Sequence, residues 1–120
     1  MKVHADLNLD RITITNGDAT TSFADFGGAI AVLNGTLNLD RGNIRDNQGS
    51  FSGGLGGVGG VGGTTMNITQ SQISDNHAFN NGGGIAVDGT LRLTRSRVVN
   101  NTADLKGGGI ARGRSWRGCR

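Results

Sequence analysis

The sequence predicts an all-β solenoid of about four incomplete coils, each 25–30 residues long. Three observations predict this fold class: a composition of strand and turn residues, a repeat of fixed phase, and a glycine cluster after each repeat. Of the 120 residues, 23 are glycine, 12 asparagine and 11 threonine, whereas proline and glutamate are absent. Long helices are not expected because strong helix formers are scarce, and without proline the glycine content does not indicate collagen. No apolar run approaches the roughly 18 residues of a membrane-spanning helix.

The repeat is defined by three apolar positions that recur in residues 5–19, 35–49, 64–78 and 89–103. The positions hold Leu7, Leu37, Met66 and Leu91, then Leu9, Leu39, Ile68 and Leu93, and last Ile14, Ile44, Ile73 and Val98. The periods are 30, 29 and 25 residues. Glycine clusters follow the repeats at residues 27–28, 53–54, 82–84 and 107–109. Self-similarity at such a period is typical of solenoid proteins.

Each repeat is expected to form three short strands separated by turns. The opening T-L-x-L alternates apolar and polar residues, as a half-buried strand does, and Asn34-Gly35 and Asp88-Gly89 favour turns. At about 3.3 Å per residue, 25 residues trace a closed circuit, and stacked circuits place equivalent residues about 4.8 Å apart. This predicts a parallel β-helix with Leu37 between Leu7 and Met66. A β-sandwich is the structural alternative, because it also contains short strands and regular turns.

The aliphatic columns are expected to form the core. Asn38 is expected to face outward, and near-complete burial is expected for Leu37, Leu39, Ile44, Ile68, Ile73, Leu91 and Leu93.

The repeat resembles those of a known superfamily. Its pattern, N-x-[A/G]-x3-G-G-[G/A]-I followed by G-T-L-x-L, is similar to right-handed parallel β-helix repeats of the pectin-lyase-like superfamily. The Gly-Gly-Ala-Ile element is similar to bacterial surface and polymorphic outer-membrane repeats. The resemblance covers residues 5–110 and implies a right-handed helix. It leaves function open, because such proteins include lyases, hydrolases, adhesins and passive stalks.

The chain divides into repeats, residues 1–110, and a basic tail, residues 111–120. The tail holds four arginines, and without them the chain has 8 basic and 9 acidic residues, so the repeats carry no basic footprint for nucleic acid. The tail is expected to be disordered or a truncation scar. The alternatives are a cap over the core, formed by Trp116, and a nucleic-acid or membrane binder. The lone Cys119 cannot form an internal disulfide.

A carboxylate pair is the most tempting catalytic feature. Asp10 and Asp40 share a phase, as do Arg11, Arg41 and Arg95. Glycan cleavage needs converging carboxylates, or carboxylates that hold calcium beside a base. The acidic column stops at Thr69 and Thr94, and His4 and His77 lie in other phases. Loose surface pairing is therefore preferred, and no catalytic, cofactor-binding or metal-binding residue is predicted.

Two further patterns have structural explanations. Asn47, Asn76 and Asn101 are expected to form a hydrogen-bonded ladder at a left-handed corner, where the first repeat has Gly17; glycan binding is the alternative. The stretch 53–63 contains G-x-G-x-x-G at Gly54, Gly56 and Gly59, and again at Gly57, Gly59 and Gly62. A dinucleotide site needs a helix after this motif, and a strand is expected instead. The stretch is interpreted as a flexible bulge and a candidate contact loop.

These features predict a non-catalytic repeat scaffold, part of an extracellular or cell-surface β-helix used for adhesion or spacing. The alternatives are part of a polysaccharide lyase or hydrolase, and nucleic-acid binding through the tail. The N-terminal MKVHADLNLD has no apolar segment of a secretory signal. Expected partners are a carbohydrate or a surface, and other copies that associate through open solenoid ends; no cofactor is expected.

Overall fold

The chain is all-β, and its strands form four parallel sheets. The computed structural model describes residues 2–3, 6–19, 28–50, 52–58, 64–80, 82–105 and 108–112. Within these residues there is no helix, and every paired strand runs parallel to its neighbour. The all-β class is therefore confirmed. The parallel pairing excludes the sandwich alternative, which is built from antiparallel sheets.

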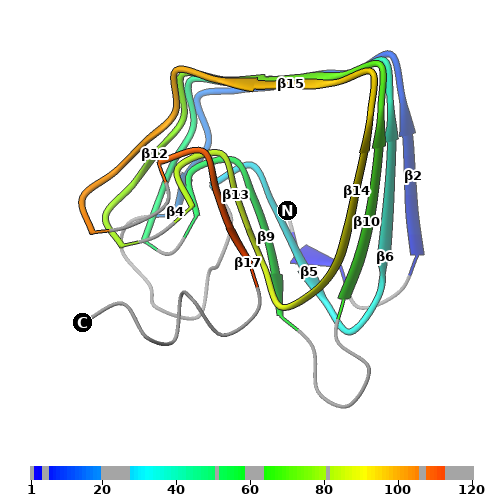
Figure 1. Cartoon of the computed structure of the whole chain (residues 1–120), viewed down its shortest axis with the longest axis horizontal. Coiled ribbons are helices and arrows are strands. Elements are labelled where there is room, and N and C mark those ends of the chain that lie inside the picture. Colours follow the sequence, from blue (N-terminus) through cyan, green and yellow to red (C-terminus); the bar gives the residue numbers. More distant parts are fainter. Residues whose placement is uncertain are drawn as a thin grey trace.

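Sheet A has five strands and sheet B has four. Sheet A has the order β1 (Lys2–Val3), β5 (Ile30–Leu33), β9 (Leu55–Val58), β13 (Ile85–Val87) and β17 (Ile110–Arg112). Sheet B has the order β14 (Gly89–Thr94), β10 (Thr64–Thr69), β6 (Thr36–Asp40) and β2 (Asp6–Asp10). In Figure 1, the strands of sheet B lie side by side at the right and those of sheet A cross the centre.

Sheets C and D each have four short strands. Sheet C has the order β15 (Arg97–Val99), β11 (Gln72–Ser74), β7 (Asn43–Arg45) and β3 (Thr13–Thr15). Sheet D has the order β16 (Thr102–Ala103), β12 (His77–Ala78), β8 (Gln48–Gly49) and β4 (Asp18–Ala19). Successive strands of the chain lie in different sheets, and the chain returns to each sheet one repeat later (Figure 1). Each repeat thus has four strands rather than the predicted three. The strand in sheet D was not predicted because its two residues are too few to show an alternating pattern.

The register between repeats agrees with the sequence alignment. Leu7 pairs with Leu37, Leu37 with Met66, and Met66 with Leu91. The same register joins Ile14, Ile44, Ile73 and Val98 in sheet C. The core consists of these columns and the inward residues of sheet A, Ile30, Val32, Leu55, Ile85 and Val87. Parallel strands of equal phase therefore bring like side chains together in the interior.

The leucine and isoleucine side chains that were expected to be buried are buried in the central strands but not in β14, the edge strand of sheet B. Leu37, Leu39, Ile44, Ile68 and Ile73 are buried, whereas Leu91 is only partly buried and Leu93 is 39% exposed. The expectation for Leu93 is wrong because β14 is the edge strand of sheet B, so one side of this column has no described strand against it. Asn38 is half-buried on the outer face, as the alternation predicts.

Leucine-to-alanine changes should therefore have unequal costs along one column. Leu39→Ala removes a fully buried side chain, and we expect the free energy of unfolding to fall by about 2–5 kcal/mol. Leu93→Ala removes one that water already reaches, so we expect a loss of about 1 kcal/mol. Urea unfolding of both variants measures the difference, and equal losses would contradict the position of Leu93 at the edge.

The first part of the glycine-rich stretch 53–63 forms a strand beside the core and not the predicted bulge. Leu55–Val58 is β9, the central strand of sheet A, and Leu55 is buried. Gly57 takes the inward position between Val32 and Val87. A Cβ at Gly57 would lie 2.9 Å from Met66 Cε and 2.9 Å from Thr64 Cγ2. The absent side chain therefore leaves room for Met66; residues 59–63 lie outside the described residues.

Candidate functional site: polar ladders inside and outside the sheets

Two corners of each repeat are made by residues with left-handed backbone. After sheet B the corner residues are Arg11, Arg41, Gln70 and Arg95, with φ between 48° and 54°, and after sheet C they are Asn16, Asp46, Asp75 and Asn100, with φ between 56° and 62°. The left-handed residue thus lies one position before the asparagine column, and the predicted left-handed conformation of Asn47, Asn76, Asn101 and Gly17 is wrong. Each corner turns the chain from one sheet into the next (Figure 1), and the residue that follows it is more buried than the corner residue.

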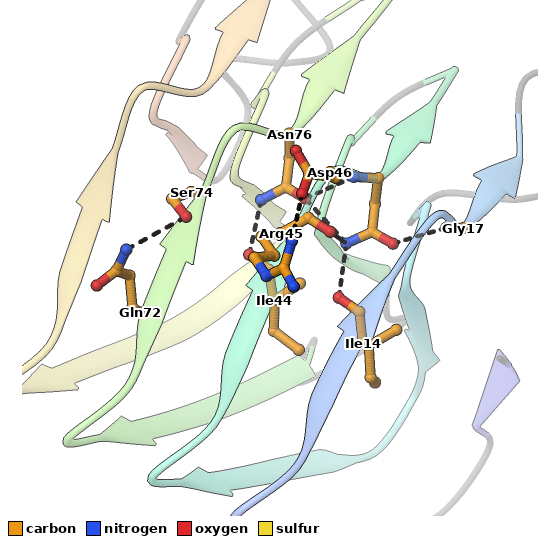
Figure 2. Close-up of polar contacts among 9 residues, drawn as sticks. Ile14, Gly17, Ile44, Arg45, Asp46, Gln72, Ser74 and Asn76 are labelled. Carbon is orange, nitrogen blue, oxygen red and sulfur yellow. Dashed lines mark hydrogen bonds and ion pairs between the residues drawn. The ribbon is translucent and has the colours of Figure 1, made fainter.

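The inward residues form the predicted asparagine ladder, which Figure 2 shows in part. Asn47 donates from its backbone N–H (3.0 Å) and its Nδ2 (2.9 Å) to Oδ1 of Asn76. Asn76 donates in the same way to Oδ1 of Asn101, at 3.0 and 2.9 Å. The ladder begins where the N–H of Gly17 donates to Oδ1 of Asn47 (2.8 Å). The hydrogen-bonded ladder is therefore confirmed, and Asn47 and Asn76 are each 1% exposed, whereas Asn101 is only partly buried.

A second, unpredicted ladder joins the other corners through serine. The N–H of Gly42 donates to Oγ of Ser71 (2.9 Å), and the N–H of Ser71 donates to Oγ of Ser96 (3.1 Å). Each hydroxyl also donates to the carbonyl oxygen two residues earlier, at 2.8 and 2.9 Å. The shared phase of Ser71 and Ser96 could have predicted it.

The outer face of sheet B presents a regular polar surface, which we call the polar face. Its side chains alternate along each strand with the inward-facing Leu, Ile and Met side chains. It comprises Asp6, Asn8 and Asp10 on β2, Thr36, Asn38 and Asp40 on β6, Thr65, Asn67 and Thr69 on β10, and Thr90, Arg92 and Thr94 on β14. Facing residues of parallel neighbours lie about 4.8 Å apart, so the polar face is an array of hydroxyl, amide and carboxylate groups.

The central column of the polar face is itself a hydrogen-bonded chain. Nδ2 of Asn38 donates to Oδ1 of Asn8 (2.7 Å), and Nδ2 of Asn67 donates to Oδ1 of Asn38 (2.8 Å). Nη1 of Arg92 donates to Oδ1 of Asn67 (3.4 Å). This row of hydrogen bonds links the side-chain amides of Asn8, Asn38 and Asn67 and the guanidinium of Arg92. The alternation of the repeat predicts that Asn38 lies on this face, but it does not predict the hydrogen-bonded column.

The carboxylate pair of the polar face is bound by arginine. Asp10 and Asp40 are register partners, and Nη2 of Arg41 lies 3.0 Å from Asp10 Oδ1 and 3.2 Å from Asp40 Oδ2. The three side chains are 42–52% exposed, so the pairing contributes less than about 1 kcal/mol. The predicted loose surface pairing is confirmed. Nη2 of Arg41 is thus within ion-pair distance of both carboxylates.

The outer face of sheet D holds a smaller polar group. Nδ1 of His77 and Oγ1 of Thr102 are 2.6 Å apart, and Nε2 of His77 is 3.3 Å from Oδ1 of Asp104. The ring of Phe79 packs edge-on against the imidazole at 5.6 Å between centroids. This group joins β12 to the edge strand β16. It was not predicted, because His77, Thr102 and Asp104 share no motif.

The other predicted features lie partly outside the described residues. Gly54, Gly56 and Gly57 of the two G-x-G-x-x-G matches lie in or beside β9, and the next described element is strand β10, as expected. The backbone of β17 reaches Arg112, two residues beyond the predicted repeats. His4, Trp116, Cys119 and the other tail arginines lie outside the described residues. Among the described residues, no three histidine, cysteine or acidic side chains group as metal ligands, and none forms a helix that could span a membrane.

No protein-family model, curated protein or solved structure matches this chain. The similarity to pectin-lyase-like repeats therefore stays a prediction from the sequence.

Proposed function

We propose that the protein is a right-handed parallel β-helix that serves as a non-catalytic scaffold, used for adhesion or spacing in an extracellular or cell-surface protein. The fold part of the proposal is supported by strands that change sheet at each step and return in register one repeat later. Handedness is supported by the resemblance of the repeats and by the strong right-handed preference of parallel crossovers.

The polar face carries the functional part of the proposal. Its amide column continues through three repeats and is fixed by hydrogen bonds of 2.7 and 2.8 Å. A preordered amide and hydroxyl array loses little side-chain entropy when it binds a partner. The chemistry that fits it is a neutral or weakly charged glycan, whose hydroxyl groups both donate and accept hydrogen bonds.

Binding to immobilised glycans tests the scaffold and adhesion role. We expect Asn38→Ala combined with Asn67→Ala to weaken retention on a matching neutral polysaccharide at least tenfold, because two groups of the amide column are lost. Gln72→Ala, an exposed change on sheet C, is the matched control and should leave retention unchanged. Absence of binding to every glycan tested, or equal loss in the control, would contradict the adhesion role.

Glycan cleavage tests the alternative enzymatic role. We expect no lyase or hydrolase turnover on pectin, alginate or similar acidic glycans, with or without calcium, because Arg41 engages both carboxylates. The measurement is release of unsaturated or reducing ends over time. Cleavage that disappears in Asp40→Asn would overturn the scaffold proposal in favour of a polysaccharide lyase or hydrolase.

A further inference from the structure

Within the part of the chain that the structure describes, the terminal strands of each sheet have a neighbouring strand on one side only. One end is formed by β1, β2, β3 and β4, and the other by β17, β14, β15 and β16. We call them the first end and the last end. Leu7 and Leu9 are only partly buried at the first end, and Leu93 is 39% exposed at the last end. Free parallel edges with apolar side chains are templates for pairing with another chain.

The two ends match each other in phase. Leu7 and Leu91 belong to one column of the register, as do Leu9 and Leu93. If β2 of a second copy pairs with β14 in the register that already joins β2 to β6, its Leu9 covers Leu93. The polar face then continues from one copy to the next.

The charges favour contact between unlike ends. At the last end, residues 89–99 carry Arg92, Arg95 and Arg97 and no carboxylate. At the first end, residues 6–15 carry Asp6, Asp10 and Arg11. The formal charges are +3 and −1, so two last ends repel each other whereas a last end attracts a first end. Complementary charge of this kind sets the orientation of an association.

Sheet A limits this contact, because it has five strands where the other sheets have four. β1 and β2 belong to the same repeat, because β1 pairs with β5 and β2 pairs with β6, and β5 and β6 are consecutive strands of the next repeat. β17 belongs to the repeat after that of β14, because it pairs with β13, the strand that precedes β14 in the same repeat. When β2 of a second copy lies on β14, its β1 and the first copy's β17 compete for one place in sheet A.

We propose that copies of this chain associate head to tail, with β2 of one copy on β14 of the next, and that β17 replaces β1 of the incoming copy. The register supports the exchange: β1 pairs through two residues, Lys2 and Val3, whereas β17 has three and carries Ile110 in the column of Ile85. Head-to-tail contacts that do not close generate filaments. The inference rests on the sheet edges, their register and their charges and does not use glycan binding, so its failure leaves the glycan-binding experiment unaffected.

Charge exchange between the two ends tests the orientation. Arg92→Glu alters the last end and Asp6→Lys the first, and both side chains are exposed. Light scattering over a dilution series should show concentration-dependent association of the wild type, at least tenfold weaker association of each variant alone, and recovery when the two variants are mixed. Arg45→Glu is the control, because Arg45 is exposed but lies on β7, which has a neighbouring strand on both sides and belongs to neither end. This variant should associate as the wild type does. A wild type that stays monomeric at millimolar concentration, or a mixture that fails to recover, would overturn the proposal.

Removal of β1 tests the strand exchange. A variant that lacks residues 2–4 no longer has to displace a strand, so its association should strengthen at least tenfold, provided that circular dichroism shows wild-type strand content. Unchanged or weaker association of this folded variant would overturn the exchange. If the variant does not fold, dilution of the wild type under the same conditions and the charge-exchange mixture still decide whether copies associate head to tail.

Discussion

Asn76→Ala is expected to lower the free energy of unfolding by about 3–5 kcal/mol. Asn76 is 1% exposed and its amide serves three neighbours. Its Oδ1 accepts from the backbone N–H of Asn47, and its Nδ2 donates to the carbonyl of Ile44 (3.1 Å) and to Oδ1 of Asn101. Alanine removes the acceptor of the Asn47 N–H and the amide donor to the Ile44 carbonyl, both next to a side chain that is 1% exposed, whereas Oδ1 of Asn101 keeps the bond from the backbone N–H of residue 76. Each buried unsatisfied group costs about 1–3 kcal/mol.

Asn38→Ala is the matched control for Asn76→Ala. Asn38 also belongs to an amide column, with hydrogen bonds to Asn8 and Asn67, but it lies on the outer face where water can replace those bonds. We expect a loss below about 1 kcal/mol. Urea unfolding followed by circular dichroism measures both values. Equal losses would show that the inner ladder is no more important for stability than the outer one.

Gly53→Ala is expected to cost about 3 kcal/mol or more and to prevent folding of a chain with a small margin of stability. A Cβ at Gly53 would lie 2.5 Å from the amide nitrogen of His77 and 2.7 Å from its carbonyl oxygen, and it would overlap the carbonyl oxygen of Gly83. All three atoms belong to the backbone of sheet D or of the turn into sheet A. Because neither can retreat without breaking strand pairing, the overlap cannot be relieved by a side-chain rotation.

Gly109→Ala provides the comparison for Gly53→Ala. The nearest atom to a Cβ at Gly109 is Cγ1 of Val98, at an ordinary contact distance of 3.8 Å. We expect a change of less than about 1 kcal/mol. Soluble yield and thermal unfolding of the two variants distinguish a steric requirement from a general effect of removing glycine. Normal folding of Gly53→Ala would contradict the close approach of the two backbones.

The sequence by itself determined the all-β class, the four repeats, their register and the asparagine ladder. These properties follow from periodicity: a residue type that recurs every 25–30 positions must meet its equivalents when the repeats lie side by side. The columns that contain Leu37, Ile44 and Ile73 were predicted for this reason, as was the outward position of Asn38. The pairing of Asp10 and Asp40 with an arginine follows from the same alignment.

Only the tertiary structure decided properties that depend on what lies next to a residue rather than on its phase. Leu93 has the phase of Leu39 but is exposed, because its strand is at the edge of sheet B. Gly57 has the phase of a core valine, but a Cβ there would lie 2.9 Å from both Met66 Cε and Thr64 Cγ2. Gly53 is required because the backbones of two repeats come into contact, and this contact depends on the fourth strand that the pattern did not predict. Periodicity specifies which residues are equivalent. The position of a strand at a sheet edge decides how exposed each residue is to water, and the distance between neighbouring backbones decides whether a side chain fits.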